Sequence, residues 1–441
     1  MAPPPTSIKR FPIFSTTCAS TLMAYSGGGG GGRTGVGNYI HVEKLEAAAR
    51  AAGVLEAVTT QISTGEAICN VLAMSGDEKL LACGIGREVY VLLLSPGGEK
   101  KGTDLVERVL SVSVSVSVGD ESSSMDVGNF AACKFKADSL DHDGKGESNA
   151  PTGCNSLSFA ATTSGSGSGS GSGKYTFASG GEDSIVRVWS LTVDSEKAKA
   201  KAKAKSVACS LLSTFKGHGK AICCVAFPLT NSNNSNNVCS SSKDGTARVW
   251  SYKTSEGLQS SLLKCSAGSG GSGGGKVEAV MVRGCAWGGE GGLEVFTTAS
   301  GRRGNAYLTR WEKSLSTDEF SPAEVTTASD MPISATAMSG DGRTFCLGGV
   351  DGIVRTFEVG GGRLKKGRRI VCHDLPITSM SCPDLQMQTV GENALTVSVV
   401  SVSADSKVCF VDATDRVDWR MVIVLLVALM MILKWLERFI L

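Results

Sequence analysis

The sequence has no excess of charge of one sign, few aromatic side chains and only four histidines. A formal net charge of +2 over 441 residues gives no strong field, and no groove-reading motif is present, which argues against nucleic-acid binding. The four histidines belong to no triad, carboxylate pair or metal-ligand grouping: His41, His142, His218 and His373. Covalent catalysis is therefore not expected.

Zinc-type cysteine pairs and a signal peptide are also missing. The 15 cysteines are scattered singly apart from Cys223 and Cys224, without the CxxC spacing of a zinc site, which indicates reduced thiols. Residues 1–10 contain three prolines and no apolar segment, so we expect a disordered N-terminus that does not direct secretion. These absences favour a folded part that faces the cytosol.

Glycine is abundant, with 55 residues, and many Ser, Thr and Val accompany it, a composition typical of short strands joined by turns. Between Phe215 and Trp250 the chain reads FKGH, an apolar strand, a second strand, the turn KDGT and the strand ARVW. The imidazole of His218, the carboxylate of Asp244 and the indole of Trp250 are then expected to meet at one corner, in a structural role. This pattern is that of a WD repeat, one blade of a β-propeller.

Weaker copies of this unit recur along the chain. They lie at residues 68–92, 177–189, 296–311, 346–357 and 377–411, and strand-like runs at 12–25 and 39–42 supply one more. His373 is a weaker copy of His218. The sequence therefore predicts an all-β fold, a WD-repeat β-propeller over residues 11–412 with seven blades, while six or eight blades stay open.

Low-complexity inserts separate several of these strands. Surface loops tolerate such insertions because closure entropy grows slowly with loop length. The SVSVSVSV run alternates in polarity and is compatible with an exposed strand. The inserts occupy residues 111–118, 164–173, 197–205, 231–237 and 268–275.

The C-terminal segment is apolar. Residues 421–433 are thirteen consecutive apolar residues, flanked by Trp419 and Trp435, which favour a membrane interface. A helix of thirteen residues covers only about 20 Å. The sixteen steps between the two tryptophans cover about 24 Å, close to the roughly 27 Å of the ER bilayer, so the segment either spans that membrane or anchors without spanning. We predict a linker at 413–420, a transmembrane helix at 421–437 and a lumenal tail at 438–441; a buried helix or a last strand is the alternative.

The run of six glycines at 27–32, followed by RTGVGN at 33–38, is the most unusual segment. It nearly fits the P-loop pattern GxxxxGK[ST], and residues 43–52 look helical. Against a P-loop, Arg33 replaces the lysine, and no Walker B carboxylate follows an apolar strand. An expanded low-complexity turn is the plain alternative. The ending favours a third interpretation, a loop that Asn38 orders through side-chain hydrogen bonds or cation coordination.

Taken together, FPIF at 11–14, the glycine run, TGVGN at 34–38, the irregular propeller and the single apolar C-terminal segment resemble one family. It is the PREB or Sec-twelve-like family, ER-membrane guanine nucleotide exchange factors that activate the Sar GTPase for COPII coat assembly. The resemblance spans nearly the whole chain, although the C-terminal tail is too short for the lumenal domain of some relatives.

The resemblance implies a non-enzymatic exchange factor on the ER membrane with its propeller in the cytosol, which contacts a Sar-type GTPase directly and COPII components indirectly. In the family the first-blade loop is ordered by potassium, which implies K⁺ held by loop carbonyls and Asn38. The implied exchange loop comprises Gly27, Gly28, Gly29, Gly30, Arg33, Thr34, Gly35, Val36 and Asn38. A membrane-anchored WD-repeat scaffold without exchange activity is the alternative function.

Overall fold

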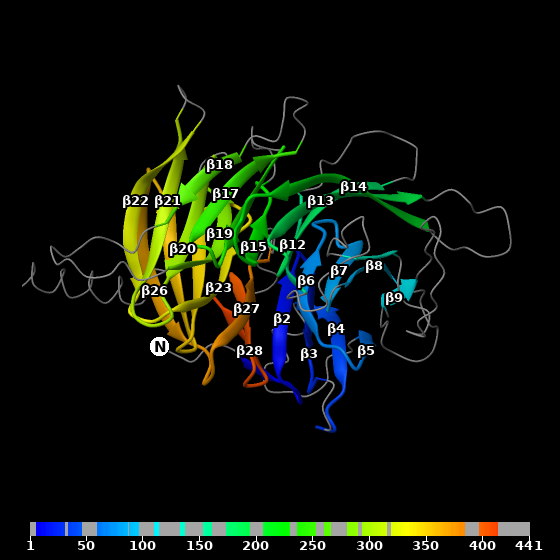
Figure 1. The fold of residues 1–441 in the computed structure, drawn as a ribbon. Coiled ribbons are helices and arrows are strands. Elements are labelled where there is room, and N and C mark those ends of the chain that lie inside the picture. The colour runs from blue at the N-terminus through cyan, green and yellow to red at the C-terminus, as the bar shows by residue number, and fades with distance from the viewer. Residues whose placement is uncertain are drawn as a thin grey trace, which may run out of the picture.

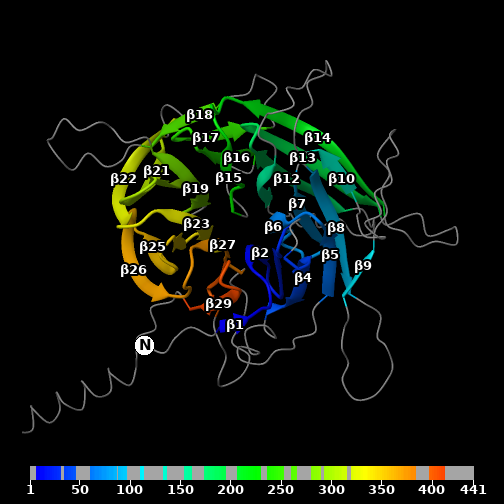
Figure 2. The same cartoon turned by 60° about the horizontal axis from the view of Figure 1, so that its bottom comes forward.

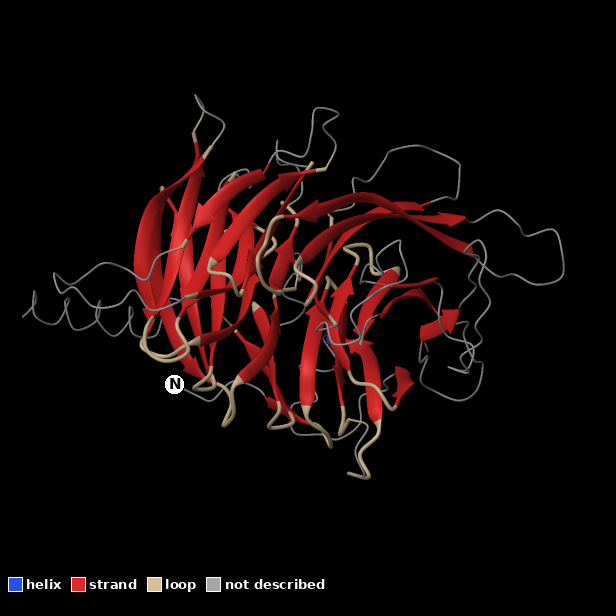
Figure 3. Ribbon diagram, in the orientation of Figure 1, coloured by secondary structure: helices blue, strands red, loops and turns tan. Residues whose placement is uncertain are grey.

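The computed structural model describes residues 6–30, 34–45, 60–86, 88–96, 110–113, 133–136, 153–160, 173–194, 206–229, 236–252, 260–265, 280–289, 293–314, 319–383 and 397–412. Nearly all of the regular structure is β-strand (Figure 3). Seven sheets stand around a ring, so the predicted all-β propeller with seven blades is confirmed (Figure 2).

Each blade is an antiparallel sheet whose strands follow one another from the inner side of the ring outward. Blade 1 contains β2 (Ile13–Cys18), β3 (Leu22–Gly27), β4 (Asn38–Lys44) and β5 (Thr60–Gly65). Blade 2 contains β6 (Cys69–Met74), β7 (Leu80–Ile85) and β8 (Glu88–Pro96), to which both β9 (Leu110–Ser113) and β10 (Cys133–Lys136) pair. Blade 3 contains β11 (Cys154–Phe159), β12 (Gly173–Gly181), β13 (Ile185–Asp194) and β14 (Ser206–Lys216).

Blades 4 to 6 follow the same order along the chain, and blade 7 differs only in its outer strand, which comes from the N-terminus (Figure 1). Blade 4 contains β15 (Ile222–Ala226), β16 (Asn237–Ser242), β17 (Thr246–Ser251) and β18 (Ser260–Lys264). Blade 5 contains β19 (Met281–Gly288), β20 (Glu294–Ser300), β21 (Ala306–Lys313) and β22 (Phe320–Ser329). Blade 6 contains β23 (Ile333–Met338), β24 (Thr344–Gly349), β25 (Ile353–Gly360) and β26 (Arg363–Val371). Blade 7 contains β27 (Ile377–Ser381), β28 (Val399–Ser403), β29 (Lys407–Val411) and β1 (Thr6–Ile8).

The ring is closed by the N-terminal strand. β1 pairs antiparallel with β29, with Thr6 opposite Cys409, so blade 7 combines the two ends of the described chain. The expectation of disorder over residues 1–10 therefore does not hold for Thr6–Ile8, because these residues complete the outer edge of a sheet. All seven blades and their closure lie within residues 6–412.

Two further expectations for the N-terminal blade differ from the structure. The run at 12–25 forms two strands, β2 and β3, separated by a turn at residues 19–21, because it folds back on itself to bury Ala19 and Leu22. Glu43 and Lys44, where the sequence looks helical, are the end of strand β4. The core lies between adjacent blades; for example, Ile13 and Met23 of blade 1 pack in one cluster with Phe410 of blade 7.

The loops divide between two faces of the ring. In every blade, the turn between the second and third strands lies on the same face as the entry to the first strand, because the sheet is antiparallel. Backbone bonds from Lys9 N–H to Ser406 C=O and from Gly28 N–H to Pro12 C=O show that the turns of blades 7 and 1 share this face. β29 runs from that face to the opposite one, where Asp412 ends the described chain.

The C-terminal predictions cannot be placed on this frame. The linker at 413–420, the helix at 421–437 and the tail at 438–441 lie outside the described residues. Within the part that is described, no helix is long and apolar enough to cross a membrane.

Candidate functional site

The glycine loop, residues 28–37, joins β3 to β4 and occupies the position at which blade 4 has its three-residue turn at 243–245. The two strands that it joins are antiparallel, with Gly27 opposite Tyr39. A P-loop requires a strand, the loop and then a helix, so this topology excludes that interpretation. Arg33 and the glycines at 31 and 32 lie outside the described residues.

Asn38 holds the base of the loop from within. Its side chain is buried, with 2% of the residue exposed. Its Oδ1 accepts a hydrogen bond of 2.9 Å from the N–H of Gly30, and its Nδ2 donates one of 3.0 Å to the carbonyl of Gly65. The loop is thus tied both to its own start and to the connection that leads into blade 2.

Two glycines are required by the path of this loop. Gly28 has a φ of 147° and Gly35 a φ of 73°, conformations that residues with a side chain rarely adopt. A Cβ on Gly28 would also lie 2.2 Å from Oδ1 of Asn38 and 2.7 Å from the carbonyl oxygen of Gly37. The glycines therefore let the two arms of the loop approach closely, which a generic flexible turn does not need.

Neutral oxygen atoms lie close to both Gly28 and Gly29. A Cβ on Gly29 would lie 2.1 Å from Oγ1 of Thr34 and 3.0 Å from the carbonyl oxygen of Val36, in addition to the two oxygens beside Gly28. Carbonyl and hydroxyl oxygens without a carboxylate are the ligands of the K⁺ ion. The chemistry of these oxygens is compatible with a potassium ion, with Asn38 Oδ1 keeping one lone pair beside its bond to Gly30.

The outer part of the loop is accessible to a partner. Thr34, Gly35 and Gly37 are exposed, and Val36 is half-buried. Oγ1 of Thr34 accepts a hydrogen bond of 3.3 Å from the N–H of Val36, which gives this tip a local turn. The predicted site residues Gly27 to Gly30, Thr34 to Val36 and Asn38 thus belong to one loop with a buried base and an exposed tip.

An aromatic stack that no sequence motif had indicated lies below the loop. The rings of Phe11 and Tyr25 each have their centroid 5.1 Å from that of His41. Neither ring nitrogen of His41 has a hydrogen-bond partner among the described residues, and burial together with the charge of Lys9 lowers the pKa of His41 to about 4. His41 is therefore neutral at physiological pH.

The blade 1 sheet has the same pairing register as the blade 4 sheet. In both sheets a bulge follows the first residue of the inner strand, and the residues that face each other across neighbouring strands occupy equivalent positions. The matching pairs are Ile13–Gly27 with Ile222–Ser242, and Tyr25–His41 with Ser240–Arg248.

This shared register identifies Lys9 and Glu43 as substitutes for WD-repeat residues. Lys9 precedes the first residue of β2 by four positions, as His218 precedes the first residue of β15. Glu43 stands two residues after His41, as Trp250 stands two residues after Arg248. Lys9 Nζ lies 3.2 Å from Oε1 of Glu43, a side chain only 1% exposed. Burial raises the pKa of Glu43, while Lys9 opposes that rise. Comparison of registers, rather than a motif, was the signal that could have found this pair.

In blade 4 the three residues predicted to be structural meet at one corner. Nδ1 of His218 lies 3.1 Å from Asp244, and its Nε2 lies 2.9 Å from the hydroxyl of Ser240, which also accepts a 2.8 Å bond from the indole of Trp250. Burial lowers the pKa of His218, although Asp244 opposes this. A neutral ring that donates to Asp244 and accepts from Ser240 satisfies every group.

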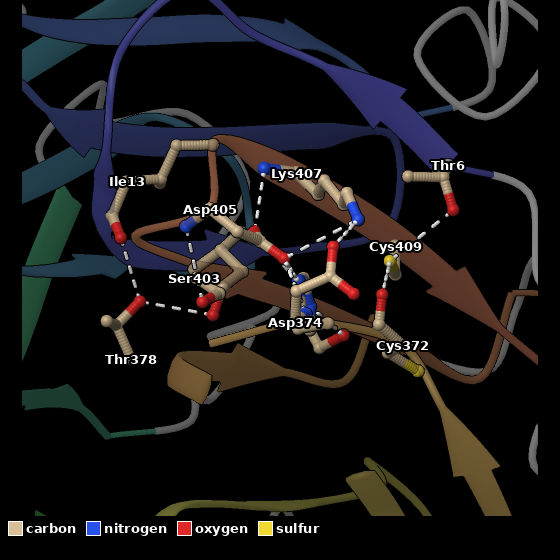
Figure 4. A network of polar contacts seen from close by, with 12 residues as sticks. Thr6, Ile13, Cys372, Asp374, Thr378, Ser403, Asp405, Lys407 and Cys409 are labelled. Atoms are coloured by element: carbon tan, nitrogen blue, oxygen red, sulfur yellow. Dashed lines mark hydrogen bonds and ion pairs between the residues drawn. The ribbon is translucent and has the colours of Figure 1, made fainter. Parts of the chain in front are cut away.

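Blade 7 repeats the arrangement with His373. Its Nδ1 lies 3.1 Å from Asp405 and its Nε2 3.0 Å from the hydroxyl of Ser401. Figure 4 shows the surrounding network, in which Lys407 reaches Asp374 and the thiol of Cys409 donates to the carbonyl of Cys372 at 3.1 Å. These contacts fix the blade that closes the ring.

The comparisons with known proteins agree with this fold. Residues 209–251 match the family model described as WD domain, G-beta repeat. A chain of the crystal structure of the mitotic checkpoint complex has a similar fold, with a TM-score of 0.54 and 11% identity over 93% of this chain and 91% of that one. At this identity the likeness concerns the fold alone. A search of the curated proteins gives no significant match. The chain is a WD-repeat β-propeller with seven blades.

Proposed function

We propose that this propeller is a guanine nucleotide exchange factor for a Sar-type small GTPase, held at the ER membrane by residues 421–437. The observation that carries the proposal is the glycine loop, because Asn38 fixes its base from both sides while its tip at Thr34 and Gly35 stays exposed. A loop held in this way loses little conformational entropy when it binds a partner.

Exchange needs no covalent chemistry. A factor that binds the nucleotide-free GTPase more tightly than the nucleotide-bound form accelerates release of the nucleotide. In this account the tip residues 33–36 contact the GTPase beside its nucleotide, and K⁺ bound by the oxygens around Gly28 and Gly29 stiffens the loop. Coat assembly by COPII components then follows from the activated GTPase.

The position of the loop also supports the proposal. The glycine loop lies on the face of the ring opposite to the end of β29, from which the chain continues toward the apolar run at 421–433. A membrane attached through that run leaves the loop free to meet a GTPase. A scaffold function would give no reason for a rigid loop at this place.

The test replaces residues 28–37 with KDG, the turn that blade 4 has at 243–245 between the corresponding strands. The propeller carrying this short turn should keep its melting temperature and lose acceleration of GDP release from an ER Sar GTPase. Equal exchange by both forms would exclude the loop as the exchange element, and partner binding without any exchange would favour the scaffold.

A further inference from the structure

The outer strand of blade 6, β26, is strongly basic. Five of the seven residues from 363 to 369 are cationic, in a chain whose net charge is only +2. Figure 2 shows β26 on the outer rim of the ring, between β22 and the closing blade. The five cations are Arg363, Lys365, Lys366, Arg368 and Arg369.

Few carboxylates offset these cations. Lys365 pairs with Glu358 at 3.0 Å, but both side chains are exposed, so the pair is weak. Asp351 pairs with the buried Arg355 at 2.6 Å, whereas Arg369 is farther from it, at 4.0 Å, and is less well neutralised. Arg363 and Lys366 are exposed and have no ion pair within the described residues, so the strand keeps a positive surface.

A cavity beside the strand adds hydroxyl groups to this charge. It has a volume of about 270 Å³, and its lining includes Lys366, Arg368 and Arg369 of β26 together with Thr327 and Ser329 from the end of β22. One carboxylate, that of Asp330, also lines it and lies 3.5 Å from Arg355, which offsets its charge. Cations and hydroxyls around a cavity of this size are the groups that bind phosphate esters. The cavity is therefore suited to an anionic headgroup.

The basic strand lies beside the point where the chain leaves the propeller. Nη1 of Arg368 donates a 2.7 Å hydrogen bond to the carbonyl of Asp412, the last described residue. Only residues 413–420 separate Asp412 from the apolar run, and an extended chain of that length reaches at most about 30 Å. Whatever surface holds the apolar run must therefore come within that distance of Arg368.

We infer that β26 and its cavity bind the phosphate-bearing headgroups of anionic lipids and dock blade 6 on the membrane surface. The inference shares with the proposed function only the membrane location of residues 421–437, and it is independent of exchange activity. β26 has no aromatic side chain on which a base could stack, which favours lipid over single-stranded nucleic acid. Docking on two points, the anchor and β26, would restrict the tilt of the propeller relative to the bilayer.

The test uses residues 1–412, which contain all seven blades and their closure but no apolar run. Flotation is measured with vesicles of phosphatidylcholine alone and with vesicles that also contain phosphatidylserine or phosphatidylinositol. We expect binding only to the anionic vesicles, with loss of binding at high salt, because surface charge is screened. The triple variant R363Q/K365Q/K366Q should bind on the order of a hundredfold more weakly, since each cation near an anionic surface contributes roughly fivefold.

The matched control is K264Q/R302Q/R303Q, which removes the same charge from exposed positions on blades 4 and 5. It should bind anionic vesicles as the unmodified fragment does. Equal loss in both triple variants, no binding to anionic vesicles, or tighter binding of RNA or free phosphate than of vesicles would overturn the inference. Both variants should accelerate GDP release in solution as the unmodified fragment does, so a failure of lipid binding is distinct from a failure of exchange.

Discussion

Asn38 and Gly30 stand eight residues apart in the chain and are joined by a 2.9 Å hydrogen bond from the glycine N–H to the buried Oδ1. This bond closes the glycine loop at its base. The other side of the same amide group donates to Gly65, so one side chain connects the loop to the rest of the ring.

We expect Asn38→Ala to abolish acceleration of GDP release and to cost about 1–3 kcal/mol of stability, because it leaves the Gly65 carbonyl and the Gly30 N–H unpaired. Asn38→Asp keeps an acceptor for Gly30 but loses the donor to Gly65. Because it also buries an unpaired carboxylate opposite that carbonyl, it should be at least as destabilising as Asn38→Ala at neutral pH. Full exchange by Asn38→Ala would show that the closed base is irrelevant.

The Lys9–Glu43 pair provides a second prediction. Lys9→Met leaves a buried carboxylate without its cation, which should cost about 3–5 kcal/mol in urea unfolding at neutral pH. The cost should diminish as the pH falls, because burial already raises the pKa of Glu43 and protonation removes the unpaired charge. The double variant Lys9→Met/Glu43→Gln should be more stable than Lys9→Met alone; additive losses would contradict a coupled pair.

The buried His41 predicts a specific loss of stability in acid. Its pKa in the folded protein is about 4, below the ordinary value of 6.5, so the unfolded chain binds more protons between these values. Stability contributed by neutral His41 is therefore lost as the pH falls from 6.5 to 4, by on the order of 3 kcal/mol. His41→Phe, which can stack with Phe11 and Tyr25 but cannot titrate, should show a shallower pH dependence over this window. Parallel curves for the two proteins would contradict the assignment.

The corner of blade 4 predicts a fourth effect. Ser240→Ala removes the hydroxyl shared by His218 and Trp250 and should cost about 2–4 kcal/mol, because two buried donors or acceptors lose their partner. Thr298→Val is the matched control: the hydroxyl of Thr298 is buried without a hydrogen-bond partner in the described structure, so its loss should be neutral or stabilising. Thermal unfolding of both variants measures these two effects, and an equal loss of stability in the two would contradict the role of the shared hydroxyl.

The sequence predicted the architecture well because a WD repeat carries its own chemistry. The His218 corner requires a glycine, an imidazole, a carboxylate and an indole at set spacings, and one strong copy revealed the weaker ones. β1 escaped prediction because three residues beside a proline run carry no pattern of their own, and their pairing with β29 joins positions 403 residues apart, as in Thr6 and Cys409.

The site was predictable only in part, for a different reason. The glycine run and Asn38 are visible in the sequence, but the role of Asn38 as a tie to Gly65 depends on the next connection of the ring. Lys9 and Glu43 resemble no motif, because they replace the usual histidine and tryptophan of their blade. Their relation emerges only when strand registers are compared.

GDP release from an ER Sar GTPase, measured with and without residues 1–412, tests the central claim most directly. The account predicts faster release with the propeller, further stimulation by K⁺ over Na⁺, and no acceleration once Asn38 is replaced by Ala. Release at the intrinsic rate in the presence of folded propeller, folded Sar and magnesium would contradict it.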